Sequence, residues 1–207
     1  MKFSSQLIEQ AVESFNSLPG IGRKSALRLA LHLLNKDPQW VQKFSDSFVN
    51  LRNKLKECSV CHNLGDQEIC AICQDPKRDR NVICIVESIR DLIAIEETGL
   101  FHGKFHVLGG LISPIDGIGP DDLHLDDLPN RIQEAQVKEV IMAISPNIEG
   151  ETTMYYISRK LGELDIKITT IARGISFGGD LEYADEITLG RSIVSRVPYH
   201  QYTEVSN

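Results

Sequence analysis

The sequence predicts an α/β protein of several domains, and three observations carry this prediction. The first part of the chain repeats apolar residues at helical spacing. Four of the five cysteines then fall within a short stretch as two Cys-x-x-Cys pairs. After residue 80, apolar runs alternate with amphipathic stretches, which is typical of parallel strands connected by helices. With 207 residues, the chain is long enough for one large domain or two smaller ones.

The N-terminal part is expected to consist of helices. Apolar residues form one stripe over residues 5–16 and a second over residues 23–34. Between them, Leu18-Pro-Gly-Ile-Gly22 supplies two glycines that can adopt positive φ. A helix, a Pro-Gly-Ile-Gly turn and a helix are the layout of a helix-hairpin-helix. A third apolar seam predicts a helix over residues 38–56, whose face belongs either to the local core or to a dimer interface.

The turn of this hairpin favours phosphate binding. Glycines at positions 20 and 22 let backbone N–H groups approach an anion, and the next helix presents the positive end of its dipole. Positive charge is added there by Arg23, Lys24 and Arg28. None of these contacts reads base sequence. The alternative is an ordinary helical hairpin, in which Gly20 and Gly22 only make the turn.

Charge is distributed unevenly along the chain, although the net charge is −7. Residues 1–57 hold nine Lys or Arg and five Asp or Glu, whereas residues 81–207 hold ten and twenty. A polyanion is therefore expected to meet the N-terminal part. The acidic remainder suits a protein partner or Mg²⁺.

The paired cysteines predict a closed tetrahedral Zn²⁺ site. The four expected ligands are Cys58, Cys61, Cys70 and Cys73. Because they fill the coordination shell, the ion is expected to be structural. Disulfides or a redox Cys-x-x-Cys are the alternatives, and the N-terminus shows no apolar signal segment that would favour disulfides. His62 could replace a cysteine but is expected on the surface, and Cys84 is expected to be a buried apolar residue.

The sequence also predicts location in the cytoplasm without a membrane segment. No apolar run approaches the roughly 18 residues that a spanning helix needs.

The C-terminal two thirds are expected to form a parallel sheet covered on both faces. A charged linker over residues 75–80 marks the expected domain boundary. The predicted strands are residues 82–86, 105–108, 139–144 and 166–171, with helices over 88–97, 128–136 and 151–164. The glycine-rich and proline-containing loop 109–125 is expected over the carboxyl ends of the strands, where open sheets build their sites.

Acidic residues follow two of these strands. Glu87 ends the first strand, and the segment Asn147-Ile-Glu149 follows the third. Carboxylates that converge there could hold Mg²⁺ for phosphoryl transfer. On residues alone, the equal alternative is that Glu87 solvates a strand end and Glu149 stabilises the N-terminus of a helix.

Several segments together resemble the bacterial recombination mediator family RecR. They are the Leu-Pro-Gly-Ile-Gly-Arg-Lys-Ser-Ala hairpin, the C-x2-C-x8-C-x2-C cluster and the Ile-Cys-Ile-Val-Glu strand, followed in register by segments 106–110, 113–119, 172–174 and 178–185. The resemblance covers essentially the whole chain. It implies a helix-hairpin-helix domain (residues 1–56), a four-cysteine zinc finger with linker (57–80), a Toprim domain (81–172) and a C-terminal tail that contributes to oligomers (173–207).

The resemblance implies a non-enzymatic DNA-binding protein in recombinational repair. Members act with RecO and RecF, help RecA displace single-strand-binding protein at gaps, and form dimers or tetrameric rings. By motif position, Lys24 and Arg28 match the residues that contact single- or double-stranded DNA, and the four paired cysteines match the zinc ligands.

One departure concerns catalysis. Catalytic Toprim enzymes bind Mg²⁺ with a strand-end Glu and a later Asp-x-Asp pair, whereas this chain has Glu87 followed by Asn147-Ile-Glu149. Asn147 removes a formal charge, which weakens a Mg²⁺ site. The edge formed by Glu87, Asn147 and Glu149 is expected to engage a partner such as RecO. A Mg²⁺-dependent nuclease or topoisomerase-like enzyme is the alternative.

Overall fold

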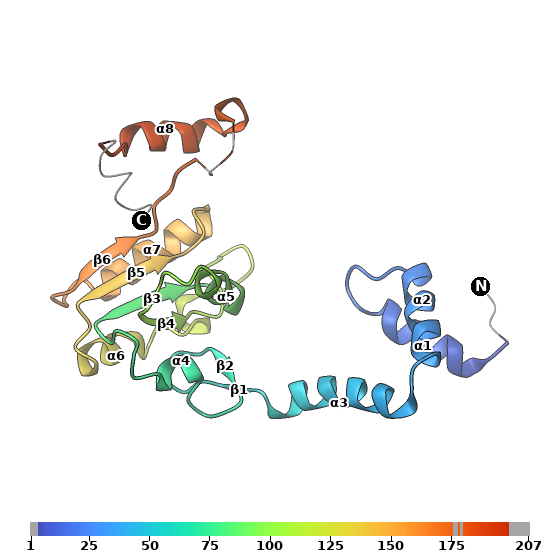
Figure 1. Ribbon diagram of the computed structural model, residues 1–207. Coiled ribbons are helices and arrows are strands. Elements are labelled where there is room, and N and C mark those ends of the chain that lie inside the picture. Colours follow the sequence, from blue (N-terminus) through green and yellow to red (C-terminus); the bar gives the residue numbers. More distant parts are fainter. Residues whose placement is uncertain (1–3, 176–177, 179, 199–207) are drawn as a thin grey trace. The chain divides into compact units, whose positions relative to one another are not determined.

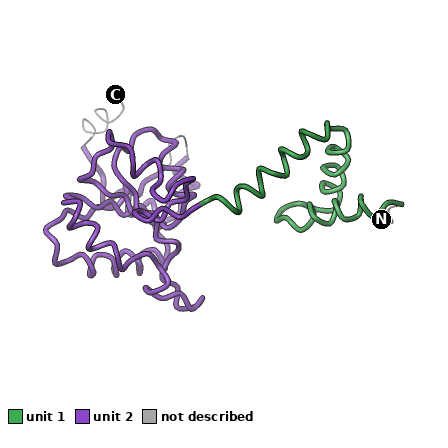
Figure 2. Tube along the Cα trace, turned by 90° about the horizontal axis from the view of Figure 1, so that it is seen from below, with its two compact units in different colours: residues 1–55 green, residues 56–207 purple. Residues whose placement is uncertain are grey.

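The structure, a computed structural model, describes residues 4–175, 178 and 180–198. The chain divides into two compact units between Leu55 and Lys56 (Figure 2). Within the described ranges, no helix combines the length and the apolar composition needed to cross a membrane.

The first unit contains α1 (Gln6–Asn16), α2 (Arg23–Leu34) and α3 (Pro38–Lys54). The first two pack together around three buried residues, with partly buried neighbours on both helices. The buried residues are Val12, Ala26 and Ala30. Asp37 begins α3 by accepting a hydrogen bond from the backbone N–H of Gln39 at 2.8 Å. The predicted helical hairpin is therefore present, and α3 ends two residues earlier than predicted.

The second unit is built on a parallel sheet, as predicted. Its strands are β3 (Val82–Val86), β4 (Lys104–Val107), β5 (Glu139–Ala143) and β6 (Lys167–Thr170), in the order β4-β3-β5-β6 (Figure 1). All three strand pairs are parallel. The helices that follow the first three strands are α5 (Ile89–Glu97), α6 (Leu128–Glu134) and α7 (Ile148–Lys160).

Alternate side chains of β3 point to opposite faces of the sheet and define two cores. Ile83 and Ile85 belong to the larger cluster, which also takes Leu128 from α6 and Ile157 from α7. Cys84 and Val86 lie in the second cluster, with Leu92 from α5. Because both faces are covered, all but the first residue of β3 are buried, which explains its continuous apolar sequence. Cys84 is thus a buried apolar residue, as expected.

The cysteine-rich segment packs along edge strand β4 and belongs to the second compact unit. It consists of β1 (Lys56–Glu57), β2 (Leu64–Gly65) and α4 (Ala71–Gln74), with β1 and β2 antiparallel. The backbone N–H of Val107 donates to the carbonyl of Cys61 at 2.9 Å, and Ile72 packs against the core beneath α5. This segment, which we call the finger (residues 56–75), therefore covers backbone groups that an edge strand would leave unpaired.

Residues 75–80, predicted to be a charged linker and the domain boundary, are packed against the sheet unit. Arg78 forms an ion pair with Glu96 and also donates to the carbonyl of Gly103 at 3.1 Å. Its side chain is only 16% exposed. The compact units divide before the finger and not after it, because these contacts hold the segment on the sheet.

Beyond β6, the structure describes η2 (Leu181–Tyr183) and α8 (Glu186–Val194). Asp185 begins α8 by accepting from the backbone N–H of Thr188 at 2.9 Å. The predicted tail (residues 173–207) therefore contains a helix that the sequence analysis did not anticipate. Residues 176, 177, 179 and 199–207 of that tail lie outside the described residues.

Candidate metal centre and phosphate-binding hairpin

The four paired cysteines converge in the finger. One ligand atom from each lies within 4.8 Å of the others, and the residues are Cys58, Cys61, Cys70 and Cys73. The first three are buried and the fourth is half-buried. None of the five cysteines forms a disulfide. Two-residue strands and a four-residue helix would not persist without a cross-link, since little else in the finger is buried.

The chemistry of this group fits Zn²⁺. Burial raises the pKa of Cys58, but backbone N–H donors outweigh that effect and lower the pKa to about 7. A hydrogen bond with Cys73, together with burial, raises the pKa of Cys61. Burial likewise raises the pKa of Cys70. Four thiolates so close together need a cation in their midst, and four sulfur ligands are those that a structural zinc ion prefers.

The side chain of Lys104 in β4 connects the finger to the sheet through hydrogen bonds. Its ammonium donates to the carbonyl oxygens of Ile72, Cys73 and Asp75 at 2.8, 3.1 and 2.8 Å. The residue is only 8% exposed, and burial lowers the pKa of its side chain. The three carbonyls lie at the C-terminal end of α4, where a cation is favourable. The predicted strand began one residue after Lys104, because lysine is rarely buried in a strand.

Replacing Lys104 by Met is expected to loosen the finger without removing its metal ligands. Methionine keeps the apolar stem but leaves three carbonyls without a charged donor, which should lower the free energy of unfolding by about 3 kcal/mol. The four-cysteine site should keep its zinc ion, which should transfer faster to a chelator. Chemical denaturation and a chelator-exchange time course measure the two effects.

The matched control for Lys104→Met is Lys167→Met, in the other edge strand, whose side chain is 68% exposed. It should change both quantities little. If zinc were transferred to the chelator at the same rate from Lys104→Met and from the unmodified chain, Lys104 would not stabilise the finger.

The hairpin turn presents an open helix N-terminus. Gly20 has φ +79°, and the N–H of Ile21 donates to the carbonyl of Leu18 at 3.2 Å, as in a type II turn with Pro19 at its second position. Gly22 is the N-cap of α2, and no side chain caps that end. A Cβ at Gly20 or Gly22 would meet nothing within 4 Å. Packing therefore does not require glycine at position 22, whereas close approach of an anion would.

The predicted basic residues lie on the first two turns of α2. Arg23, Lys24 and Arg28 are exposed, and positions 24 and 28 share one face of the helix. The guanidinium of Arg23 lies 3.9 Å from a carboxylate oxygen of Glu9, so its charge is partly countered. Lys24 and Arg28 are the two basic side chains best placed beside the open N–H groups.

The three predicted acidic-edge residues line one cleft of about 470 Å³ at the carboxyl ends of β3 and β5. They are Glu87, Asn147 and Glu149. Loop 109–125 forms the opposite wall, as expected, with Ser113 and Ile118 among its lining residues.

Two of these three side chains have local structural partners. The hydroxyl of Ser145 donates to Glu87. Asn147 is the N-cap of α7, and its side-chain oxygen accepts from the N–H of Gly150 at 2.7 Å. Among the residues described, no three acidic groups of this cleft lie within 4.8 Å of one another.

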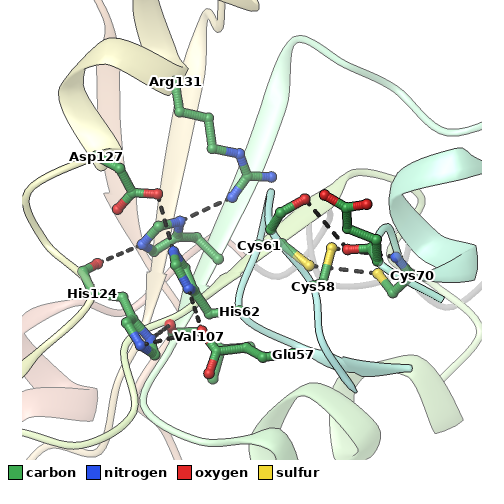
Figure 3. A network of polar contacts seen from close by, with 12 residues as sticks. Glu57, Cys58, Cys61, His62, Cys70, Val107, His124, Asp127 and Arg131 are labelled. Atoms are coloured by element: carbon green, nitrogen blue, oxygen red, sulfur yellow. Dashed lines mark hydrogen bonds and ion pairs between the residues drawn. The ribbon is translucent and has the colours of Figure 1, made fainter. Parts of the chain in front are cut away.

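A cluster of three histidines, where the finger meets strand β4 and the loop after it, was missed by sequence reasoning. His62, expected on the surface, has a side chain only 16% exposed and stacks on His124 with ring centroids 3.8 Å apart (Figure 3). His106 is buried, and burial lowers its pKa to about 4. Burial opposes protonation of His62, but hydrogen bonds to Glu57 and Asp127 outweigh it and raise its pKa. The expectation for His62 was wrong because His124 and Asp127 are distant from it in the sequence.

The fold and sites together define a multidomain protein with a helix-hairpin-helix, a zinc finger of four cysteines and a Toprim domain. Residues 8–51 match the family described as RecR, helix-hairpin-helix, and residues 55–75 match the RecR four-cysteine zinc finger domain. Residues 81–172 match the family described as Toprim domain, and residues 174–197 match the family described as RecR, C-terminal.

Whole-chain comparison agrees. The chain is 52% identical over 199 residues to Recombination protein RecR of Parabacteroides distasonis, covering 96% of each chain. It is 53% identical over 195 residues to the protein of that name from Phocaeicola vulgatus, covering 94% of this chain and 95% of the relative. The Cytophaga hutchinsonii protein is 51% identical over 197 residues, with 95% and 96% covered. The chain belongs to the RecR family of recombination proteins.

Proposed function

We propose that this chain is a non-enzymatic DNA-binding mediator of recombinational repair. Its hairpin grips DNA phosphates without sequence preference, while the acidic edge (Glu87, Asn147 and Glu149) engages a partner such as RecO. Acting with RecO and RecF, it helps RecA displace single-strand-binding protein at gaps. Zn²⁺, held by the four paired cysteines, keeps the finger folded.

The observation that carries this proposal is the uncapped N-terminus of α2 behind a Gly20 turn, with Lys24 and Arg28 exposed beside it. The N-terminus of α2 therefore combines free backbone N–H groups, the positive end of the helix dipole and two cationic side chains. The chain as a whole is acidic, with a net charge of −7. A phosphate backbone is the polyanion that this arrangement fits.

Reversing both charges, as Lys24→Glu/Arg28→Glu, is expected to weaken DNA binding uniformly across sequences. Because two phosphate contacts are lost, the slope of log affinity against log salt should fall by about two for duplex DNA. Fluorescence anisotropy with single- and double-stranded oligonucleotides at several salt concentrations measures both the affinity and the slope.

The matched control places the same charge change on α3, as Lys43→Glu/Arg52→Glu, where both residues are exposed. It should leave the salt slope close to that of the unmodified chain. Equal losses in the two double variants would mean that overall charge, and not the hairpin, governs binding, and unchanged affinity in the first would remove the hairpin from the mechanism.

We also propose that the protein works as a homodimer or homotetramer. Within its own unit α3 buries none of its residues, and its apolar side chains Trp40, Phe48 and Leu51 are 44%, 57% and 57% exposed. A face of this kind is stabilised when a second copy covers it. Light scattering coupled to gel filtration determines the number of copies.

The Toprim cleft supports partner binding better than Mg²⁺-dependent cleavage, because Asn147 caps α7 and Ser145 donates to Glu87. Incubation with labelled DNA and Mg²⁺ tests this assignment. Cleavage or relaxation that Glu87→Gln abolishes would establish the enzyme in place of the mediator.

A further inference from the structure

From the histidine cluster where the finger meets the sheet, we propose a second metal site in this chain, which holds a divalent transition-metal ion with Glu57, His62 and His124. These residues offer a carboxylate oxygen and two ring nitrogens that lie within 4.8 Å of one another. Two imidazoles and a carboxylate are a ligand set for Zn²⁺ and related ions. All three ligands are distinct from the four paired cysteines.

The hydrogen bonds around the cluster fix which ring nitrogens are free. The Nδ1 atom of His124 lies 3.0 Å from the carbonyl oxygen of Val107, which can only accept, so Nδ1 carries the proton. The Nε2 atom of His62 lies 3.0 Å from a carboxylate oxygen of Asp127, so Nε2 carries the proton there. In the neutral rings, the lone pairs are then on Nε2 of His124 and Nδ1 of His62.

Both lone pairs face the same carboxylate oxygen. Oε1 of Glu57 lies 2.7 Å from Nδ1 of His62 and 3.4 Å from Nε2 of His124 (Figure 3). With both rings neutral, three acceptor atoms therefore gather at one place. A proton on Nδ1 of His62 would satisfy the carboxylate oxygen and leave Nε2 of His124 facing it without a donor. One divalent cation satisfies all three acceptors.

The surroundings of the two rings are those of metal-ligating histidines. Such residues donate their second ring N–H to a carboxylate or a backbone carbonyl, which orients the ring. Asp127 plays that part for His62, and the carbonyl of Val107 plays it for His124. The rings are nearly parallel, at 12°, so a tilt of His124 is needed to bring the lone pairs together. The 35% exposure of its side chain leaves room for that tilt.

The third histidine is not a ligand. The Nε2 atom of His106 donates to the carbonyl of His124 at 2.6 Å, and its Nδ1 accepts from Arg131 at 2.9 Å. Both ring nitrogens are thus occupied. His106 instead packs edge-on against His62, with the two ring centroids 5.2 Å apart.

The backbone of His62 supports the same inference. Its φ is +61°, a conformation that glycine adopts more readily than any residue with a side chain. A side chain is nevertheless present and is held by contacts with two carboxylates. The ion would join Glu57 and His62 of the finger to His124 of the loop after β4, and would therefore cross-link the finger to the sheet.

The test measures zinc bound by tag-free protein. After equilibration with buffered Zn²⁺, the unmodified chain should hold two equivalents and His124→Ala one. The control His102→Ala, which removes an exposed histidine outside the cluster, should hold two. Added Zn²⁺ should raise the unfolding temperature of the unmodified chain and not that of His124→Ala.

A further variant keeps all three ligands. Asp127→Asn should weaken the second ion about 10–100-fold in calorimetric titration, because it removes the carboxylate that orients His62. It tests the site even where His124→Ala fails to fold. A single equivalent in the unmodified chain, or two equivalents in a folded His124→Ala, would overturn the proposal, as would unchanged affinity in Asp127→Asn.

Discussion

Replacing Cys58 by Ala is expected to release the zinc ion and unfold the finger while the parallel sheet remains folded. Three thiolates hold Zn²⁺ far less tightly than four, and binding to a structural zinc site supplies about 10–16 kcal/mol of folding free energy in isolated fingers. The finger has few other buried residues to replace that contribution. The sheet keeps its own large core, to which no cysteine of the finger belongs.

Unfolding of the finger should nevertheless destabilise the sheet. Lys104 would lose three ordered carbonyl acceptors, and edge strand β4 would lose its cover. The unfolding temperature of the second unit should fall, with its strand and helix content largely kept. Elemental analysis gives the zinc content, and circular dichroism during heating gives the transition.

The control for Cys58→Ala is Cys84→Ala, which removes the fifth cysteine from strand β3. Burial raises the pKa of Cys84 to about 12, and it lies outside the metal cluster. This variant should keep one equivalent in the four-cysteine site. A Cys58→Ala protein that stayed fully folded without zinc would refute the structural role of the ion.

The sheet could be predicted from the sequence because its strands are buried on both faces. Such strands form continuous apolar runs, and those of β3 and β5 were located within one residue of their observed bounds. The strands of the finger could not be found in this way. Each has only two residues, so neither shows a repeating pattern. The start of α8 carried a usable signal, Asp185 three residues before Thr188, although the segment was predicted only as part of a tail.

The candidate sites that could be predicted are those whose residues lie close together in the sequence. The cysteine pairs and the glycine turn are local in sequence, so their spacing already indicates their chemistry. Asn147 was interpreted from the sequence only as the replacement of an acidic metal ligand, whereas its contact with Gly150 shows that it is the N-cap of α7. The histidine cluster depends on residues from the finger and from the loop after β4. Their proximity is a product of tertiary packing, which no local pattern records.

Replacing Gly150 by Ala should cause the largest loss of stability of any glycine-to-alanine change at the described glycines of the sheet unit. A Cβ at this position would overlap the carbonyl oxygen of Ser145 and lie 2.9 Å from the side-chain oxygen of Asn147. Ser145 contributes backbone, which cannot turn aside, so the first turn of α7 must move. Alanine favours a helix by about 1 kcal/mol, but overpacking against backbone should destabilise the unit by about 3 kcal/mol.

Movement of α7 would also separate groups of the acidic edge. Asn147 could no longer cap the helix, and the hydroxyl of Ser145 would shift from Glu87. Urea denaturation of the Gly150→Ala protein measures the loss in stability. The matched control is Gly190→Ala in α8, where a Cβ meets nothing within 4 Å and the same substitution should be neutral or slightly stabilising. If the two variants unfolded at the same urea concentration, the close approach of α7 to Ser145 would not govern the stability of this unit.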